Sequence, residues 1–259
     1  MLNLAGKGVL VVGTRRLGQW VVRRLAAEGV GLAIGYYRSR AEAEDLYYSL
    51  AAKGTKARLV QGDLTVEEDV KRMVQEAREG LGGLSFVVNL ASDFPRTPLA
   101  SLDGEAWDQG MAAAKGSFLL AVHAARALMK NPGPTRGHIL LFSDWAAGET
   151  PYRHYLPYLT SKAAIDFMTR AFAVELAPHG ILVNAIAPGP TMRPPDLSEE
   201  TWQRRVVAGT PLQRESSIDD MAELIVALLK SETITGETIR VDSGRHLAGP
   251  GAMDVEERR

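Results

Sequence analysis

A tyrosine and a lysine four residues apart, Tyr158 and Lys162, stand in the segment YLTSK. If this segment is a helix, residues at this spacing share one helix face. A phenol has a pKa of about 10, and a neighbouring ammonium group stabilises the phenolate and lowers that value. Tyr158 can then donate a proton to a carbonyl or imine-type centre while hydride arrives from the other side. The alternative is a helix that merely exposes a tyrosine and a lysine.

Two further tyrosines, Tyr152 and Tyr155, precede this pair in the stretch FSDWAAGETPYRHYLPYLTSK. Neither of them has a lysine four residues later. We therefore expect Tyr158 to perform the chemistry, and Tyr152 and Tyr155 to form walls of a pocket.

The elements that position these residues are indicated by the hydrophobic pattern. Short apolar runs at 9–12, 31–35, 57–60, 86–89, 138–142, 181–186 and 238–241 are typical of buried strands. Segments of helical period, such as TVEEDVKRMVQEAREG, lie between them. This alternation predicts an α/β fold: a single-domain, Rossmann-type doubly wound parallel sheet of about seven strands with helices on both faces.

Composition limits the function classes. The 259 residues allow one domain over 1–248, with a substrate loop at about 190–210 and a C-terminal tail at 249–259. The formal net charge of -1 offers no basic field for nucleic acid. The sequence has no cysteine, and its five histidines lack metal-ligand spacing, so we expect no metal site. No apolar run reaches the roughly 18 residues of a membrane span, and we expect a cytoplasmic protein with a small-molecule substrate.

The expected first strand ends in VVGTRRLGQW, where Gly13 and Gly18 bracket a turn that leads directly into a helix. Glycines at such a turn let the backbone approach a pyrophosphate, whose charge is stabilised by N–H groups at the helix N-terminus. The same residues are compatible with an ordinary strand-to-helix loop. Their position after the first strand favours dinucleotide binding.

The second strand leads into YYRSR, where a dinucleotide-binding fold usually presents an acidic residue to the adenosine ribose. Tyr37, Arg38, Ser39 and Arg40 offer basic and hydroxyl groups instead, which favours a 2′-phosphate and predicts NADPH over NADH. Exposed arginines at a helix start are the alternative. Asp63, in QGDL, either accepts a hydrogen bond from the adenine amino group or caps a helix.

The chain resembles the short-chain dehydrogenase/reductase family over almost its whole length. The motifs VGTRRLG, GDL, VVNLAS, YLTSK, NAIAPGPT and ITGETIRVDSG occur in that family's order and approximate spacing. Within the family, the loop NLASDFPRTPL resembles that of pteridine reductases, as do RRLG and VDSGRH. The resemblance implies an NADP-dependent oxidoreductase that transfers hydride from NADPH to a C=N or C=O of a small planar substrate, and it implies a homotetramer.

The third catalytic position is open between two residues. Typical family members place a serine, and pteridine reductases an aspartate, at the position that Trp145 occupies in this chain. Asp144 and Ser143 immediately precede it, so a one-residue insertion brings one of them into the site. The pteridine-reductase resemblance favours Asp144, and an aspartate at a surface turn is the structural alternative.

The motifs and the resemblance together imply a set of binding residues. The expected cofactor-binding residues are Gly13, Arg15, Arg16, Leu17, Gly18, Tyr37, Arg38, Ser39, Asp63, Leu64, Asn89, Ala91, Ser92, Pro188, Gly189 and Thr191. The expected substrate pocket consists of Phe94, Trp145, Tyr152, Met192 and Arg193. The Phe94 ring either stacks on a planar heterocycle or packs under its own loop. Met192, Arg193 and Trp202 are candidates to close over the substrate.

Two features depart from the family pattern. The glycine turn is one residue shorter than usual, and Ala113 and Ala114 stand where the family has an asparagine that helps hold a water beside the active-site lysine. Two alternatives therefore remain beside a pteridine reductase. One is a general carbonyl or 3-oxoacyl thioester reductase, and the other is a nucleotide-binding scaffold with little catalysis.

Overall fold

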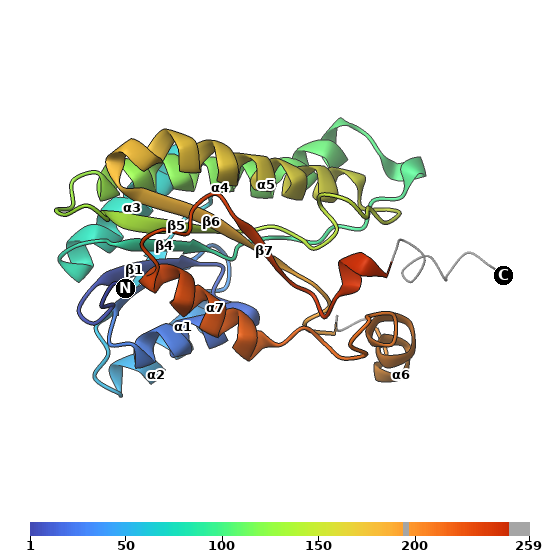
Figure 1. Ribbon diagram of the computed structural model, residues 1–259, viewed down its shortest axis with the longest axis horizontal. Helices are drawn as coiled ribbons and strands as arrows, with labels where there is room; N and C mark the ends of the chain where they lie inside the picture. Colours follow the sequence, from blue (N-terminus) through green and yellow to red (C-terminus); the bar gives the residue numbers. More distant parts are fainter. Residues whose placement is uncertain (194–196, 249–259) are drawn as a thin grey trace.

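A seven-stranded parallel sheet lies between two layers of helices in the computed structural model, which describes residues 1–193 and 197–248 (Figure 1). The strands are β1 (Gly8–Val12), β2 (Gly31–Tyr36), β3 (Ala57–Gln61), β4 (Phe86–Asn89), β5 (Gly137–Phe142), β6 (Ile181–Pro188) and β7 (Thr238–Val241). The helices are α1 (Leu17–Ala27), α2 (Arg40–Ala51), α3 (Glu67–Leu81), α4 (Gly104–Leu128), α5 (Leu156–Leu176), α6 (Glu199–Thr201) and α7 (Ile218–Lys230). Three 3₁₀ turns are η1 (Leu99–Ser101), η2 (Ala177–His179) and η4 (Arg245–Leu247), and η3 (Trp202–Val207) is a π-helical segment.

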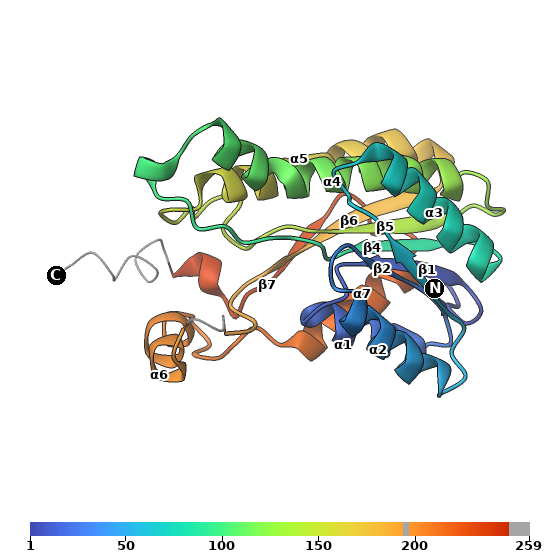
Figure 2. The ribbon, with the colours of Figure 1, turned by 180° about the vertical axis from the view of Figure 1, so that it is seen from behind.

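The two helical layers cover opposite faces of the sheet. Helices α3, α4 and α5 lie on one face, and α1, α2 and α7 lie on the other, as both ribbon views show (Figure 2). Each face has its own core: Leu10 and Val12 of β1 belong to one buried cluster, and Val9 and Val11 belong to the other. Because side chains alternate along a strand, a strand covered on both sides is apolar at every position. The predicted doubly wound α/β fold is confirmed.

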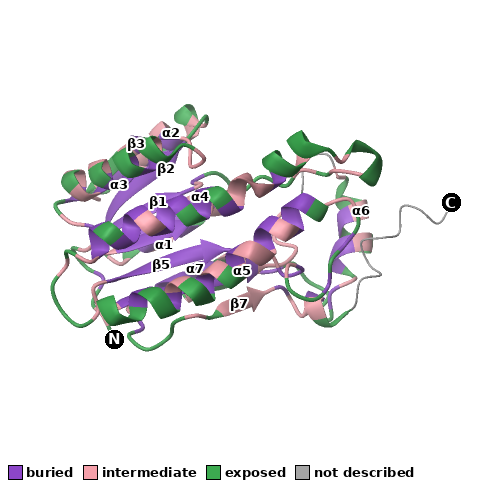
Figure 3. Ribbon diagram, turned by 90° about the horizontal axis from the view of Figure 1, so that it is seen from above, coloured by how far each residue is buried: buried purple, intermediate pink, exposed green. Residues whose placement is uncertain are grey.

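The strand order is β3-β2-β1-β4-β5-β6-β7. Strands β2 and β3 are added on one side of β1, and β4 to β7 are added on its other side. In such sheets a ligand crevice forms at the carboxyl ends of the strands, where the connections diverge. The buried strands and the exposed outer sides of the helices are visible from above (Figure 3). The predicted site residues all lie at or beyond these carboxyl ends, or at the start of α5.

The predicted substrate loop contains helical structure. Ser198 Oγ accepts a hydrogen bond from the Thr201 N–H at 3.2 Å, so Ser198 caps α6, which continues into the π-helical turn η3. The predicted substrate loop thus contains helical structure at 199–207. The predicted tail 249–259 lies outside the described residues. No helix within the described ranges is long and apolar enough to cross a membrane, and these ranges contain no group of three acidic, histidine or cysteine side chains arranged to hold a metal.

Acid is expected to destabilise the fold through His138 of β5. This side chain is fully buried, and its ring lies 5.5 Å from that of Phe86. Burial lowers the pKa of His138 to about 4, whereas the unfolded residue titrates near 6.5. Protons therefore bind the unfolded chain preferentially, and stability should fall by up to about 3 kcal/mol as the pH drops from 6.5 towards 4.

Urea unfolding of His138→Leu across this pH window checks the prediction. The free energy of unfolding of the variant, measured relative to that of the parent, should rise as the pH falls. His179→Leu removes an exposed histidine and serves as the matched control. A pH-independent difference for His138→Leu would contradict the assignment.

Candidate active site

Tyr158 and Lys162 lie on the inner face of α5, and both are buried. Pro157 in the first turn suits the helix start, because that position needs no backbone N–H donor. Lys162 Nζ donates a hydrogen bond to the Phe142 carbonyl at 2.8 Å and lies 5.6 Å from the centroid of the Tyr158 ring. The spacing of four residues thus brings the phenol and the ammonium group together at the end of β5.

Asp144, and not Ser143, contacts the tyrosine. The Tyr158 hydroxyl donates to Asp144 Oδ2 at 2.8 Å, while Asp144 Oδ1 accepts from the Ala146 N–H at 2.9 Å. Ser143 Oγ instead donates to the main-chain carbonyl of Lys162 at 3.2 Å. The two candidates for the third catalytic position therefore point to different partners.

The electrostatics of this group differ from the expectation for Tyr158. Burial raises its pKa well above the usual value, and the Asp144 carboxylate adds to this shift. Burial likewise raises the pKa of Asp144, and it lowers the pKa of Lys162 to about 8. Within the protein itself, burial and the neighbouring carboxylate act against the phenolate, so the lysine does not by itself lower the Tyr158 pKa. The phenol is held protonated, as a proton donor requires.

Aromatic rings cover the phenol. Phe94 lies 4.8 Å from Tyr158 edge-on and stacks on Tyr155 at 4.3 Å and 21°. Trp145 stacks on Tyr152 at 5.9 Å behind them. The Phe94 side chain is 47% exposed, so one part of this cluster remains accessible to a planar ring.

Arg245 packs against this aromatic cluster. The sequence did not predict it as a site residue. Its guanidinium carbon lies 4.9 Å from the Trp145 ring centroid, and the side chain is 1% exposed. A buried cation over an indole face fixes the ring. The motif VDSGRH contained this arginine, but spacing alone does not indicate that it packs against Trp145.

The alanines that replace the family asparagine lie where α4 packs on α5. The Ala114 N–H donates to Ser161 Oγ at 2.9 Å, next to Lys162 in the chain. A side chain at Gly110 would come within 2.2 Å of Pro157, so the two helices are in close contact at the start of α5. This contact fixes the position of the Tyr158–Lys162 pair.

The glycine turn forms a close approach between β1 and β4. Gly13 has φ 83°, and a Cβ atom there would lie 2.4 Å from the Ala91 nitrogen. A Cβ on Gly18 would lie 2.2 Å from the Gly13 carbonyl oxygen. Only glycine fits at these points, and the turn directs the N-terminus of α1 to the carboxyl edge of the sheet, where an anionic group is stabilised. The shorter glycine spacing is therefore compatible with a dinucleotide phosphate.

Three arginines lie near the predicted adenosine end: Arg38 contacts a tyrosine ring, and the other two are paired with acids. The Arg38 guanidinium lies 4.7 Å over the exposed Tyr37 ring. Arg40 pairs with Glu44 at 2.7 Å, and Arg15 pairs with Glu42 at 3.4 Å. Arg38 is thus the residue best placed to meet an anion.

Other predicted cofactor residues shape the loops after the strands. Asp63 Oδ1 accepts hydrogen bonds from the N–H and hydroxyl of Thr65, which is a local turn. Asn89 Oδ1 accepts from the Ala91 N–H at 3.1 Å, and Thr191 Oγ1 donates to the Gly189 carbonyl at 2.9 Å. The remaining members of the predicted set, at or directly after the carboxyl ends of β1, β2, β3, β4 and β6, are Leu17, Ser39, Leu64, Ser92 and Pro188.

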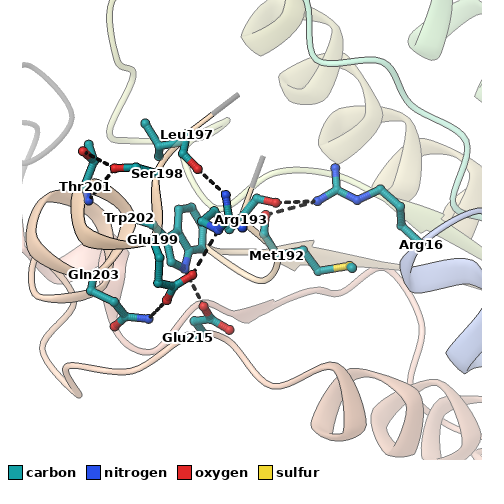
Figure 4. Close-up of polar contacts among 10 residues, drawn as sticks. All are labelled: Arg16, Met192, Arg193, Leu197, Ser198, Glu199, Thr201, Trp202, Gln203 and Glu215. Carbon is teal, nitrogen blue, oxygen red and sulfur yellow. Dashed lines mark hydrogen bonds and ion pairs between the residues drawn. The ribbon is translucent and has the colours of Figure 1, made fainter. Parts of the chain in front are cut away.

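Arg16 connects the glycine turn to the predicted substrate loop (Figure 4). Its Nη2 donates to the carbonyls of Met192 and Arg193, both at 3.3 Å. Arg193 in turn pairs with Glu199 at 3.0 Å, and Trp202 Nε1 donates to Glu215. The described parts of this loop are tied to the glycine turn, to α6 and to the segment before α7.

Comparison with known proteins identifies the family. A family model described as enoyl-(acyl carrier protein) reductase matches residues 12–246. The short-chain dehydrogenase/reductase eriH of Hericium erinaceus is 30% identical over 256 residues, which cover 93% of this chain and 99% of that protein. The chain belongs to the short-chain dehydrogenase/reductase family. Another relative, a 3-oxoacyl-(acyl-carrier-protein) reductase of Staphylococcus aureus, is 28% identical over 93% of this chain and 98% of its own length.

Solved structures of short-chain dehydrogenase/reductases share the fold. The FolM alternative dihydrofolate reductase 1 of Brucella suis, in complex with NADP, is 34% identical with a TM-score of 0.86, covering 94% of this chain and 96% of that one. A short-chain dehydrogenase of Burkholderia cenocepacia, also in complex with NADP, is 30% identical with a TM-score of 0.85, covering 94% and 99%. The predicted family is confirmed.

Proposed function

We propose that this oxidoreductase is an NADPH-dependent, pteridine-reductase-like enzyme that transfers hydride to a C=N or C=O of a small planar substrate. The observation that carries the proposal is the 2.8 Å hydrogen bond from Tyr158 to Asp144 beside the buried Lys162. The accessible Phe94 ring next to the phenol supports a planar substrate. Similarity to the FolM alternative dihydrofolate reductase 1 of Brucella suis, at 34% identity, supports the same substrate class.

The cofactor would be held by the Gly13–Gly18 turn and by Arg38, and it would supply the hydride. Tyr158 would donate a proton to the substrate atom beside it. Lys162 offsets the negative charge that then develops on the phenolate. Asp144 would orient the hydroxyl by accepting its hydrogen bond, and burial raises the pKa of its carboxyl, which favours uptake of a proton that the carboxyl could pass to the phenolate.

A 3-oxoacyl thioester reductase is the second candidate, favoured by the Staphylococcus aureus relative and by the description of the family model. It would reduce acetoacetyl thioesters and ignore dihydropterins. A nucleotide-binding scaffold would bind NADPH and turn over neither.

NADPH oxidation with dihydrobiopterin, dihydrofolate and an acetoacetyl thioester separates these functions. We expect turnover of the dihydropterins, because Phe94 and Tyr155 provide a flat aromatic wall beside the proton donor. Turnover of the thioester alone would favour the second candidate. Bound NADPH without turnover of any substrate would favour the scaffold.

Arg38 should determine the preference for the 2′-phosphate. The sequence predicts that joint replacement of Arg38 and Arg40 weakens this preference. Because Arg40 is paired with Glu44, we expect Arg38 to account for most of the effect. Arg38→Ala should weaken NADPH binding about tenfold and leave NADH binding unchanged, because a charge-assisted contact to phosphate is lost. Fluorescence titration with both cofactors measures this, with Arg40→Ala as the matched control. Equal losses for both cofactors would contradict the prediction.

The oligomeric state and the cellular location of the protein remain predictions. The homotetramer is supported by exposed apolar side chains on α4 and α5, where Phe118, Phe167 and Val174 are 48%, 66% and 75% exposed. The cytoplasmic location rests on the composition and on the family resemblance.

A further inference from the structure

A second carboxyl group, Asp166, lies behind Lys162, one helical turn further along α5. Its Oδ1 accepts a hydrogen bond from Thr238 Oγ1 of β7 at 3.2 Å. Ser143, at the end of β5, also lies next to Asp166, and its single hydroxyl proton is donated to the Lys162 carbonyl at 3.2 Å. Three elements of the fold thus meet at a carboxyl group that the proposed proton transfer does not use.

Two acids, Asp144 and Asp166, act electrostatically on the buried ammonium group of Lys162. It is 2% exposed, and its Nζ donates to the Phe142 carbonyl at 2.8 Å. Burial lowers the pKa of Lys162 to about 8, and Asp144 and Asp166 both oppose this by favouring the charged form. Without these acids, a lysine buried to this degree would lose its proton more readily still.

The two acids differ in the groups that face them. Asp144 accepts from Tyr158, and burial raises its pKa. Burial also raises the pKa of Asp166, but Ser143, Thr238, Arg170 of α5 and Arg240 of β7 all favour its charged form. Arg240 is itself shared with Glu149 at 3.2 Å. Arginines on α5 and β7 thus favour a negative charge on Asp166, although burial raises its pKa overall.

We propose that Asp166 is a positioning residue that acts on the reaction through Lys162, by keeping a negative charge behind its buried ammonium group. The inference rests on the proposed function of the Tyr158–Lys162 pair. A protonated Lys162 stabilises the phenolate that remains after Tyr158 donates its proton, so the charge of Asp166 extends activity to higher pH. Removing this charge makes Lys162 lose its proton at lower pH.

The test follows the titration of Lys162 directly. The full-length protein is labelled with ¹³C at the lysine Cε atoms, the Lys162 resonance is identified by its loss in Lys162→Arg, and the pH is raised from about 6 to about 10. In Asp166→Asn the midpoint should move to lower pH by on the order of one unit. Asp166→Ser should give the same shift if the asparagine variant does not fold, and Asp166→Glu should restore the parent midpoint.

Glu175→Gln is the matched control, because it makes the same change in net charge at an exposed position of α5. An unchanged midpoint in the neutral variants, or an equal shift in Glu175→Gln, overturns the proposal. The alkaline limb of substrate turnover should move with the midpoint, whereas a uniform loss of turnover at all pH values would indicate a structural role and also overturn it. A shifted midpoint in a protein that turns over none of the substrates would overturn the proposed function and not the control of Lys162 by Asp166.

Discussion

Replacement of Tyr158 by phenylalanine is expected to cut turnover by about 10² to 10⁴ and to leave NADPH affinity nearly unchanged. The change removes the hydroxyl that donates to Asp144 at 2.8 Å. The ring itself remains packed against Phe94, 4.8 Å away, and beside Lys162. Only the proton donor is lost. Single-turnover NADPH oxidation by the variant should therefore be slower than by the parent, and fluorescence titration should give a similar NADPH affinity for both.

Tyr155→Phe is the matched control for this experiment. Tyr155 belongs to the same aromatic cluster and stacks on Phe94 at 4.3 Å, but the donor to Asp144 is Tyr158. The loss of its hydroxyl should change turnover far less than the loss of the Tyr158 hydroxyl. Full activity in Tyr158→Phe, or the larger loss in Tyr155→Phe, would show that the donor is assigned wrongly.

The positions of the central strands could be predicted because β1, β2, β4, β5 and β6 are short apolar runs buried on both faces. The predicted runs 86–89 and 238–241 agree with β4 and β7 at both ends. The run 181–186 ends two residues early, since β6 continues to Pro188, where pairing with Val241 of β7 extends the strand. Strand ends depend on the neighbour in the sheet, which the hydrophobic pattern of one strand does not contain.

The choice between Ser143 and Asp144 could not be made from the sequence for a related reason. The Ser143 N–H still donates to the Ile186 carbonyl at 2.9 Å, so β5 pairing persists one residue beyond the strand and directs Ser143 towards the α5 backbone. The chain turns immediately afterwards, with the Ala147 N–H bonded to the Asp144 carbonyl at 3.1 Å. A shift of one residue in the end of the strand would exchange the two side chains.

Contacts between residues far apart in the chain could not be predicted from the sequence either. The raised pKa of Tyr158 requires the proximity of Asp144 and the burial of both groups. The hydrogen bonds from Arg16 to the Met192 and Arg193 carbonyls join residues far apart in the sequence. The chemistry of YLTSK could be inferred from residue types and spacing, whereas its electrostatic setting depends on the tertiary structure.

Asp144→Asn is expected to lower turnover by about 10², whereas Ser143→Ala should lower it far less. The asparagine amide oxygen can still accept a hydrogen bond from Tyr158, so the phenol keeps its orientation, and the amide N–H can donate to the phenolate but cannot transfer a proton to it as a carboxyl can. Burial raises the pKa of the Asp144 carboxyl, which makes it a better carrier of a proton than an exposed aspartate, and asparagine carries no such proton. Ser143 donates to the Lys162 backbone, so its loss weakens support for the helix without removing a group that faces the phenol. Steady-state turnover of the dihydropterins compares the two variants, and a larger loss in Ser143→Ala would transfer the third catalytic role to the serine.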